Sequence, residues 1–383
     1  MSFMADTLNK WMADLSPGGQ LSRRAWCAVK YTPKGSTEEK DISEDLAKYL
    51  LSVDYNDNIT EQVDDVTLTL EDRAQLWLGD WFPEVGSKLD ITIYTLNKES
   101  LSKGRKEYHV GAFEIDEIEM NMPPSMVQIK AVSVISDSAL RGVKKNRTWE
   151  KISIWKCADD IAKENGIACD WYCKENPNLD HVEQSDESDL EFLRKVTKDA
   201  GFCLKVTPEK IIIIDEEKQE EGEVKIVFIR PGTDAGEVTE KESSSENEKM
   251  TVNRFLTYRL TAKTRDIYKA CHVKYKKGKE KKVIEATFTA PNKKDGKTLE
   301  VNEQVENVAE AERLAKKKLR EQNKDEVTAS FSLYGDFNFA AGVLVELKNF
   351  GKFDGKYIIT KAGHKLGGGY TSDLELRKCL DGY

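Results

Sequence analysis

Residues 335–347, GDFNFAAGVLVEL, repeat the pattern of residues 79–91, GDWFPEVGSKLDI, far upstream. In both stretches a Gly-Asp pair precedes an aromatic residue, and a second glycine, Gly86 or Gly342, stands seven positions after the first. An alternation of apolar and polar residues follows, which is typical of a strand with one buried face. The recurrence predicts two copies of one structural unit.

The likeness continues downstream of both motifs. Residues 111–132, GAFEIDEIEMNMPPSMVQIKAV, align without a gap to residues 355–376, GKYIITKAGHKLGGGYTSDLEL, and each segment reads as strand, turn and strand. The loop before this segment is 12 residues shorter in the second copy. Loops vary in length while cores do not, so the pattern predicts a duplicated domain rather than a solenoid. The paired positions are Gly79 and Gly335, Gly86 and Gly342, Gly111 and Gly355, and Phe113 and Tyr357.

Length and composition indicate a multidomain protein. The 383 residues suffice for two or three domains of ordinary size. The net charge of -9 disfavours broad nucleic-acid affinity, since binding phosphates requires clustered basic residues. No apolar run approaches the roughly 18 residues of a membrane span, and the first residues lack a secretory signal, so we expect synthesis in the cytoplasm. Seven cysteines, an odd number, indicate reduced thiols.

Periodicity and composition divide the chain into five segments, and the expected fold class is α+β, mainly β. Two segments contain alternating stretches that predict antiparallel strands in a barrel or a tightly curved sheet. The segments are residues 1–20, an amphipathic docking helix; 21–138, the first β-barrel domain; 139–215, an α/β insert; 216–250, an acidic flexible segment with a short strand; and 251–383, a second β-barrel domain that includes an amphipathic helix.

The first 20 residues carry apolar side chains at helical spacing, and Pro17 with two glycines ends the pattern. Such a helix either packs on its own domain or docks onto a partner, and the two interpretations are evenly balanced. Exposed aromatic residues on one face of a terminal helix would need covering, which motivates the second interpretation. The candidate docking residues are Phe3, Leu8, Trp11 and Met12.

The insert shows two helix patterns and one hairpin pattern. Apolar residues recur at helical spacing from Ile154 to Ala162, and Gly166 ends the pattern. Ser188 and Glu191 have the spacing of a capping box. Residues 202–215, FCLKVTPEKIIIID, read as two strands joined by a turn.

A further helix is predicted over residues 303–323, with an apolar face and with its basic residues late in the helix. Cations near the carboxyl end suit the helix dipole. The basic run KYKKGKEKK, residues 274–282, reads as a solvated hairpin tip. The predicted apolar face consists of Val305, Val308, Ala311, Ala315 and Leu319, and the late basic residues are Lys316, Lys317, Lys318 and Arg320.

No motif for catalysis, a cofactor or a metal stands out. The sequence contains no GxSxG, Walker loop, HExxH or dinucleotide fingerprint. A lone strand histidine such as His364 is more often structural than catalytic. Cys157, Cys169, Cys173 and His181 lack the spacing of a standard zinc finger. We therefore expect no catalytic, cofactor-binding or metal site, and no enzyme activity.

Five stretches together resemble the phage late control protein D family, whose members are baseplate hubs of contractile tails, similar to the hub part of the type VI secretion spike protein VgrG. Their order and spacing make the combination more specific than any single stretch. The stretches are residues 64–93, DDVTLTLEDRAQLWLGDWFPEVGSKLDITI; 111–119, GAFEIDEIE; 185–206, SDESDLEFLRKVTKDAGFCLKV; 309–319, AEAERLAKKKL; and 351–376, GKFDGKYIITKAGHKLGGGYTSDLEL.

This resemblance implies a homotrimer in which each chain supplies two similar tube-forming β-barrels, so that a pseudo-sixfold ring joins a hexameric tail tube to a trimeric central spike. The partners implied are the tube protein, a separate spike protein and other baseplate proteins, with DNA passing through the lumen without specific binding. The particle is a phage tail or a headless, bacteriocin-like relative. The motifs at Gly79–Gly86 and Gly335–Gly342 would shape tube-facing surfaces, while Gly111 with Phe113 and Gly355 with Tyr357 would hold the two cores.

Three alternatives stay open at this point. A tail-associated cell-wall hydrolase should show an acidic or cysteine nucleophile with supporting groups. A receptor-binding tail protein should carry aromatic residues on exposed loops. A carrier of type VI effectors should have further domains after the hub part, and we expect none here because the chain ends soon after the last predicted strand.

Overall fold

The structure is a computed structural model, and it is mainly β with few helices. The predicted amino-terminal helix and its docking residues lie outside the part of the chain that it describes. The chain divides into two compact units, unit 1 (Met1–Asn56, Asp64–Ser136 and His364–Thr371) and unit 2 (Asp57–Val63, Asp137–Gly363 and Ser372–Tyr383). The described residues are 23–59, 63–79, 81–98, 104–133, 139–207, 210–231, 249–277, 282–305 and 307–382.

Unit 1 is built on a run of antiparallel neighbours. Apolar residues alternate with polar ones along these strands, and the apolar set is buried, as in β4, where Val66, Leu68 and Leu70 are inaccessible to solvent. A short helix, α2 (Ser43–Ala47), follows the second strand. In spatial order the strands are β3 (Leu50–Asn58), β4 (Asp65–Glu71), β7 (Met126–Val132), β6 (Arg105–Asn121), β5 (Lys88–Leu96), β1 (Arg24–Thr32) and β2 (Lys40–Asp41).

Unit 2 contains a second run of strands that pack around an aromatic core. Phe228, Phe331 and Tyr357 are fully buried in this core, where the rings of Phe228 and Phe331 lie 4.9 Å apart in an edge-to-face arrangement. A short 3-10 helix, η3 (Gly351–Phe353), leads into β21. In spatial order the strands are β15 (Thr257–Ala262), β19 (Val327–Tyr334), β22 (Tyr370–Lys378), β21 (Gly355–Leu366), β20 (Leu344–Lys348), β13 (Ile226–Ile229) and β14 (Met250–Val252).

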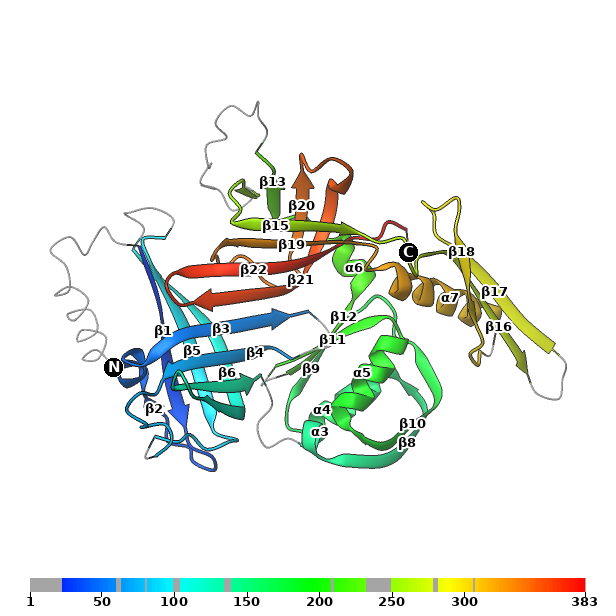
Figure 1. Cartoon of the computed structure of the whole chain (residues 1–383). Coiled ribbons are helices and arrows are strands. Elements are labelled where there is room, and N and C mark those ends of the chain that lie inside the picture. Colours follow the sequence, from blue (N-terminus) through cyan, green and yellow to red (C-terminus); the bar gives the residue numbers. More distant parts are fainter. Residues whose placement is uncertain are drawn as a thin grey trace. The chain divides into compact units, whose positions relative to one another are not determined.

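The predicted insert forms helices and two small sheets within unit 2 (Figure 1). The Ser188–Glu191 capping box is confirmed at the start of α5, and α4 ends before Gly166 as predicted. The 202–215 hairpin is confirmed, but its second strand also pairs in parallel with β9, which the sequence pattern did not reveal. The elements are α3 (Ala139–Gly142), β8 (Lys144–Ser153), α4 (Ile154–Glu164), β9 (Ala168–Tyr172), β10 (Asn178–Ser188), α5 (Asp189–Asp199), β11 (Phe202–Val206) and β12 (Lys210–Asp215).

A three-stranded sheet covered by one helix completes unit 2. Figure 1 shows α7 (Val308–Asn323) beside this sheet, whose order is β17 (Lys282–Thr289), β16 (Tyr268–Lys277) and β18 (Lys297–Val301). β16 and β17, which carry the two ends of the basic run, pair antiparallel up to Lys277 and Lys282, and the middle of the run lies outside the described residues. The predicted helix is wrong at its start: Val308 is its first residue and is 58% exposed, and Val305 is buried ahead of it. Ala311, Ala315 and Leu319 do form the buried face.

The segment predicted over 216–250 as acidic and flexible with a short strand contains that strand, β13, but begins with a helix that was not predicted. Residues Glu216–Glu221 form a helix, α6, which Asp215 caps by accepting from the backbone N–H groups of Glu217 and Lys218. The acidic composition suggested solvation, but Glu220 is buried against arginines from distant parts of the chain. Strand β13 then enters the core. Residues 232–248 lie outside the described part.

Candidate functional site

One strand order occurs twice in the chain. Unit 1 has the order β3-β4-β7-β6-β5-β1, and unit 2 has the order β15-β19-β22-β21-β20-β13. The sixth strand differs, because β1 runs antiparallel to β5 whereas β13 runs parallel to β20. In each copy, four consecutive strands follow one another along the chain in the same way: β4, β5, β6 and β7 in unit 1, and β19, β20, β21 and β22 in unit 2.

The two copies also share their hydrogen-bonding register. A slip of one residue would turn every side chain to the opposite face, so a shared register places equivalent side chains on equivalent faces. This agreement could not follow from the strand order alone. The equivalent Cα partners are Leu89 with Phe113 and Val345 with Tyr357, and then Ile91 with Gly111 and Leu347 with Gly355.

The second glycine of each motif has the same conformation and the same bond. Gly86 and Gly342 have φ angles of +90° and +88°, a region that side chains with a Cβ rarely adopt. Each glycine donates its N–H to a carbonyl oxygen 2.8 Å away, Gly86 to Ile115 and Gly342 to Ile359. A glycine is therefore needed at both positions, and the sequence motif has a physical cause.

The aromatic residue of each repeat lies in a core. Phe113 packs edge-to-face on Tyr55, with 6.0 Å between the ring centres, and is almost fully buried. Tyr357 is fully buried and donates its hydroxyl to the carbonyl oxygen of Phe353 at 2.7 Å. The hydroxyl group of Tyr357 thus needs a hydrogen-bond acceptor in the core, whereas Phe113 has no hydroxyl and needs none.

The first glycines of the two motifs are placed differently. Gly335 directly follows β19, whereas Gly79 lies well beyond the end of β4, in a loop that reaches to β5. In that loop Trp77 is buried and packs edge-to-face on Trp81, with ring centres 5.6 Å apart. The first copy therefore carries a longer loop at this end of the repeat, anchored by two tryptophans.

Large apolar side chains are exposed at sequence-aligned positions in the two copies, in the first copy's loop and at the end of β19 in the second. Leu78 is 57% exposed, and Tyr334, one residue before Gly335, is 65% exposed. The longer loop adds Phe82 and Val85, each about half exposed. A cluster of exposed apolar groups on one loop is typical of an interaction surface. Sequence reasoning singled out the glycines of these motifs but not these exposed side chains.

His364 and the cysteines lie in structural surroundings. His364 is buried, stacks on Tyr55 and lies 2.8 Å from the hydroxyl of Tyr370 through Nδ1. Cys157 is buried, and burial raises the pKa of its thiol to about 12. Across the described ranges, no group of three or more His, Cys, Asp or Glu side chains is arranged to hold a metal ion. No helix in the described part is long and apolar enough to cross a membrane.

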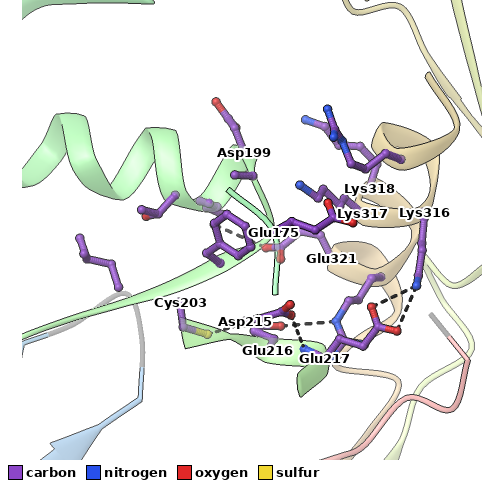
Figure 2. Close-up of a pocket in the computed structure, with 18 of the residues that line it drawn as sticks. Glu175, Asp199, Cys203, Asp215, Glu216, Glu217, Lys316, Lys317, Lys318 and Glu321 are labelled. Carbon is purple, nitrogen blue, oxygen red and sulfur yellow. Dashed lines mark hydrogen bonds and ion pairs between the residues drawn. The ribbon is translucent and has the colours of Figure 1, made fainter. Parts of the chain in front are cut away.

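A cavity that the sequence did not predict lies within unit 2. Its volume is about 720 Å³, and it is bounded by the end of α5, the start of β11, the start of α6 and one face of α7. Figure 2 shows Lys316, Lys317 and Lys318 on α7 across from acidic side chains at the start of α6. The lining includes ten basic and six acidic side chains, although the chain as a whole has a net charge of -9.

Buried charges join α6 to α7 and β22 beside this cavity. Glu220 accepts from Arg320 at 2.6 Å and also from Arg377. Glu216 lies 3.3 Å from Arg377 and accepts from the thiol of Cys203 at 3.1 Å. Burial by itself raises the pKa of Glu216, but the positive charges led by Arg377 outweigh it and hold this pKa below its ordinary value. These contacts fix the cavity wall by linking segments far apart in sequence.

Comparisons with known proteins identify relatives of this chain. The family model for the phage tail baseplate hub (GPD) matches residues 135–369. The chain is 25% identical over 180 residues to the probable baseplate hub protein of Escherichia phage 186, a match that covers 46% of this chain and 42% of that relative. The matched stretch thus spans less than half the length of the curated relative.

Two solved structures share the fold at low sequence identity. The tail protein from Neisseria meningitidis MC58 has a TM-score of 0.63 at 11% identity, over 92% of this chain and 97% of that one. A chain of the half-lidded Francisella PdpA-VgrG complex has a TM-score of 0.53 at 9% identity, over 98% of this chain and 62% of that one. The structural neighbours therefore include a tail protein and a chain from a VgrG complex.

Proposed function

This chain belongs to the phage tail baseplate hub (GPD) family, and we propose that it is the structural hub of a contractile tail or a related puncturing device. In this role it joins the tail tube to the central spike. The role is mechanical, with no bond made or broken, and the chain is not an enzyme. Sheath contraction drives tube, hub and spike together through the target envelope.

The hub is a homotrimer in which the two copies of the repeat in each chain form six similar β-barrel units. The observation that carries this proposal is the strand order and register shared by the two copies. Six similar units can meet a hexameric tube on one face, while the true threefold symmetry suits a trimeric spike on the other. A ring closes through heterologous contacts only if its surfaces are mutually complementary, which a duplication can provide.

The tube-facing surface includes the loop that precedes the second glycine in each copy. Leu78 in the first copy and Tyr334 in the second occupy aligned positions and are both exposed. The first copy adds Phe82 and Val85. The two connections join equivalent strands, β4 to β5 and β19 to β20, but differ in length and chemistry. This is expected when three chains supply six contacts of two alternating kinds.

The experiment is to measure the native mass of the full chain by light scattering, alone and with the cognate tube and spike proteins. We expect a trimer, either alone or on addition of the spike, and incorporation of tube protein. The variants Phe82→Glu and Tyr334→Glu should reduce tube binding while the trimer persists. The matched control is Val283→Glu on β17, an exposed apolar position outside both loops.

A monomer that binds neither partner would overturn the hub proposal. If Phe82→Glu, Tyr334→Glu and Val283→Glu all bind the tube equally, only the assignment of these loops to the tube is overturned, and the hub proposal stands. Digestion of purified peptidoglycan by the full chain would show that the non-catalytic role is wrong.

A further inference from the structure

The basic face of α7 combines partnered and unpartnered charges. Lys316 pairs with Glu217 at 3.0 Å, and Lys324 pairs with Glu321 at 2.9 Å. Arg320 is bound by Glu220, as described above. Because residues three and four apart share one helix face, all these cations border the same cavity.

Two cations on this face make no ion pair with any carboxylate in the described part of the chain. They are Arg313 and Lys317, four residues apart and so about one helical turn from each other. Like charges at this spacing destabilise a helix. Glu175, Asp199 and Asp215 also line the cavity, but none of them forms an ion pair with Arg313 or Lys317. An anion bound between Arg313 and Lys317 would replace this repulsion with two attractions.

Lys317 is held in place by packing rather than by a carboxylate. The Cγ, Cδ and Cε atoms of its stem lie about 3.3 Å from where a Cβ on Gly201 would stand, so the stem packs against the turn between α5 and β11. Its ammonium nitrogen lies 5.3 Å from the ring centre of Phe202. The aromatic face attracts the cation but leaves its hydrogen-bond donors available.

Burial and a neighbouring cation both act against the charged form of Lys317. Burial, followed by the charge of Arg313, lowers the pKa of Lys317 to about 8. Glu175 and Asp215, which also line the cavity, act in the opposite direction, as does Cys173, but they do not offset the first two effects. A bound dianion would restore the pKa toward that of an ordinary lysine.

We propose that the cavity between α5, α6 and α7 is a binding site for a small phosphate-class oxyanion, which Arg313 and Lys317 hold between them. The guanidinium can donate two parallel hydrogen bonds to such an anion, and the ammonium adds a compact charge. The cavity volume of about 720 Å³ is ample for an inorganic anion and also for a small organic phosphate. This site is distinct from the exposed loops assigned to the tube, and its test does not depend on the hub function.

The test is calorimetric titration of the full chain with inorganic pyrophosphate, and in parallel with a nucleoside diphosphate. Equal affinity for the two would indicate recognition of the phosphates alone, and tighter binding of the nucleotide would identify an organic phosphate as the source. Lys317→Met keeps an apolar stem but removes the charge, and Arg313→Gln removes the second charge. Each should weaken pyrophosphate binding about tenfold or more, as expected for loss of a charge-assisted bond.

A control variant and two further readouts separate a binding role from a structural one. Lys163→Met, which removes an exposed α4 lysine paired with Asp159, should bind pyrophosphate like the wild type. Without ligand, Lys317→Met should melt at the same temperature as the wild type or higher, because it relieves the repulsion from Arg313. Binding of sulfate, whose own charge stays constant, should weaken as the pH rises above about 8, where Lys317 loses its proton.

Three results would overturn the site. One is the absence of heat from pyrophosphate at millimolar concentration. Another is equal binding by the wild type, Lys317→Met and Arg313→Gln. The last is an equal loss of affinity in Lys163→Met, which would indicate general charge attraction. Trimer formation and tube binding should be unaltered in Lys317→Met, so failure of this proposal is distinguishable from failure of the hub proposal.

Discussion

Replacing Glu220 by glutamine should destabilise unit 2 far more than the same change at its neighbour Glu221. Glu220 is buried, and its carboxylate accepts from Arg320 at 2.6 Å, from Arg377, and from the backbone N–H of Leu380 at 2.9 Å. Breaking a buried ion pair typically costs about 3–5 kcal/mol, because the remaining charge stays buried without its partner. Glutamine keeps one acceptor and Glu216 remains nearby, so we expect about 3 kcal/mol.

The control lies on the same helix. Glu221 pairs with Lys174 at 2.7 Å, but both side chains are more than half exposed, so Glu221→Gln should leave stability unchanged within error. Denaturant titration would measure the loss of free energy of unfolding. Hydrogen exchange of peptides from α6 and β22 would show whether these two elements lose protection. If Glu220→Gln proves as mild as Glu221→Gln, the buried network does not anchor α6, and the reasoning fails.

Three further outcomes follow from the local geometry. Gly342→Ala should lower stability by about 1–3 kcal/mol in thermal unfolding, because its φ is +88°, whereas Gly142→Ala in a short helix should cost nothing; equal melting temperatures would contradict this. Tyr357→Phe should cost about 1 kcal/mol through loss of the bond to Phe353, and an unchanged denaturation midpoint would count against that bond. The pKa of Glu216 is lowered on folding, so its contribution is present at neutral pH and is lost as the pH falls below the ordinary value of 4.5. An acid-unfolding midpoint that does not shift in Glu216→Gln would refute the assignment.

Local signals in the sequence predicted what local geometry controls. The capping box at Ser188 and Glu191 depends on residues three positions apart, and the structure confirms it. The repeated pattern was visible because a buried strand face and a positive φ both restrict which residues can occupy a position. The start of α7 was misplaced because Val305 carries the same apolar signal whether it lies in a helix or just before one.

Contacts between segments far apart in the chain could not be predicted from the sequence. Acidic composition around Glu220 indicated solvation, and nothing nearby in sequence announced that Arg320 and Arg377 would meet it. The cavity has the same origin, since its walls come from α5, α6 and α7. The basic residues of α7 were visible in the sequence, but their preference for the carboxyl end of a helix was enough to explain them. Only the structure showed that they border a cavity.

The sequence by itself determined that this chain is mainly β and that it carries a repeated sequence pattern, because strand alternation and the motif glycines depend on individual residues. Only the tertiary structure decided that the two copies share one register, that Glu220 is buried, and that Arg313 and Lys317 border a cavity without a carboxylate partner in the described residues. The physical reason is the distance along the chain over which each interaction acts. Backbone conformation and periodicity act over a few residues, whereas burial and charge pairing depend on segments that only folding brings together.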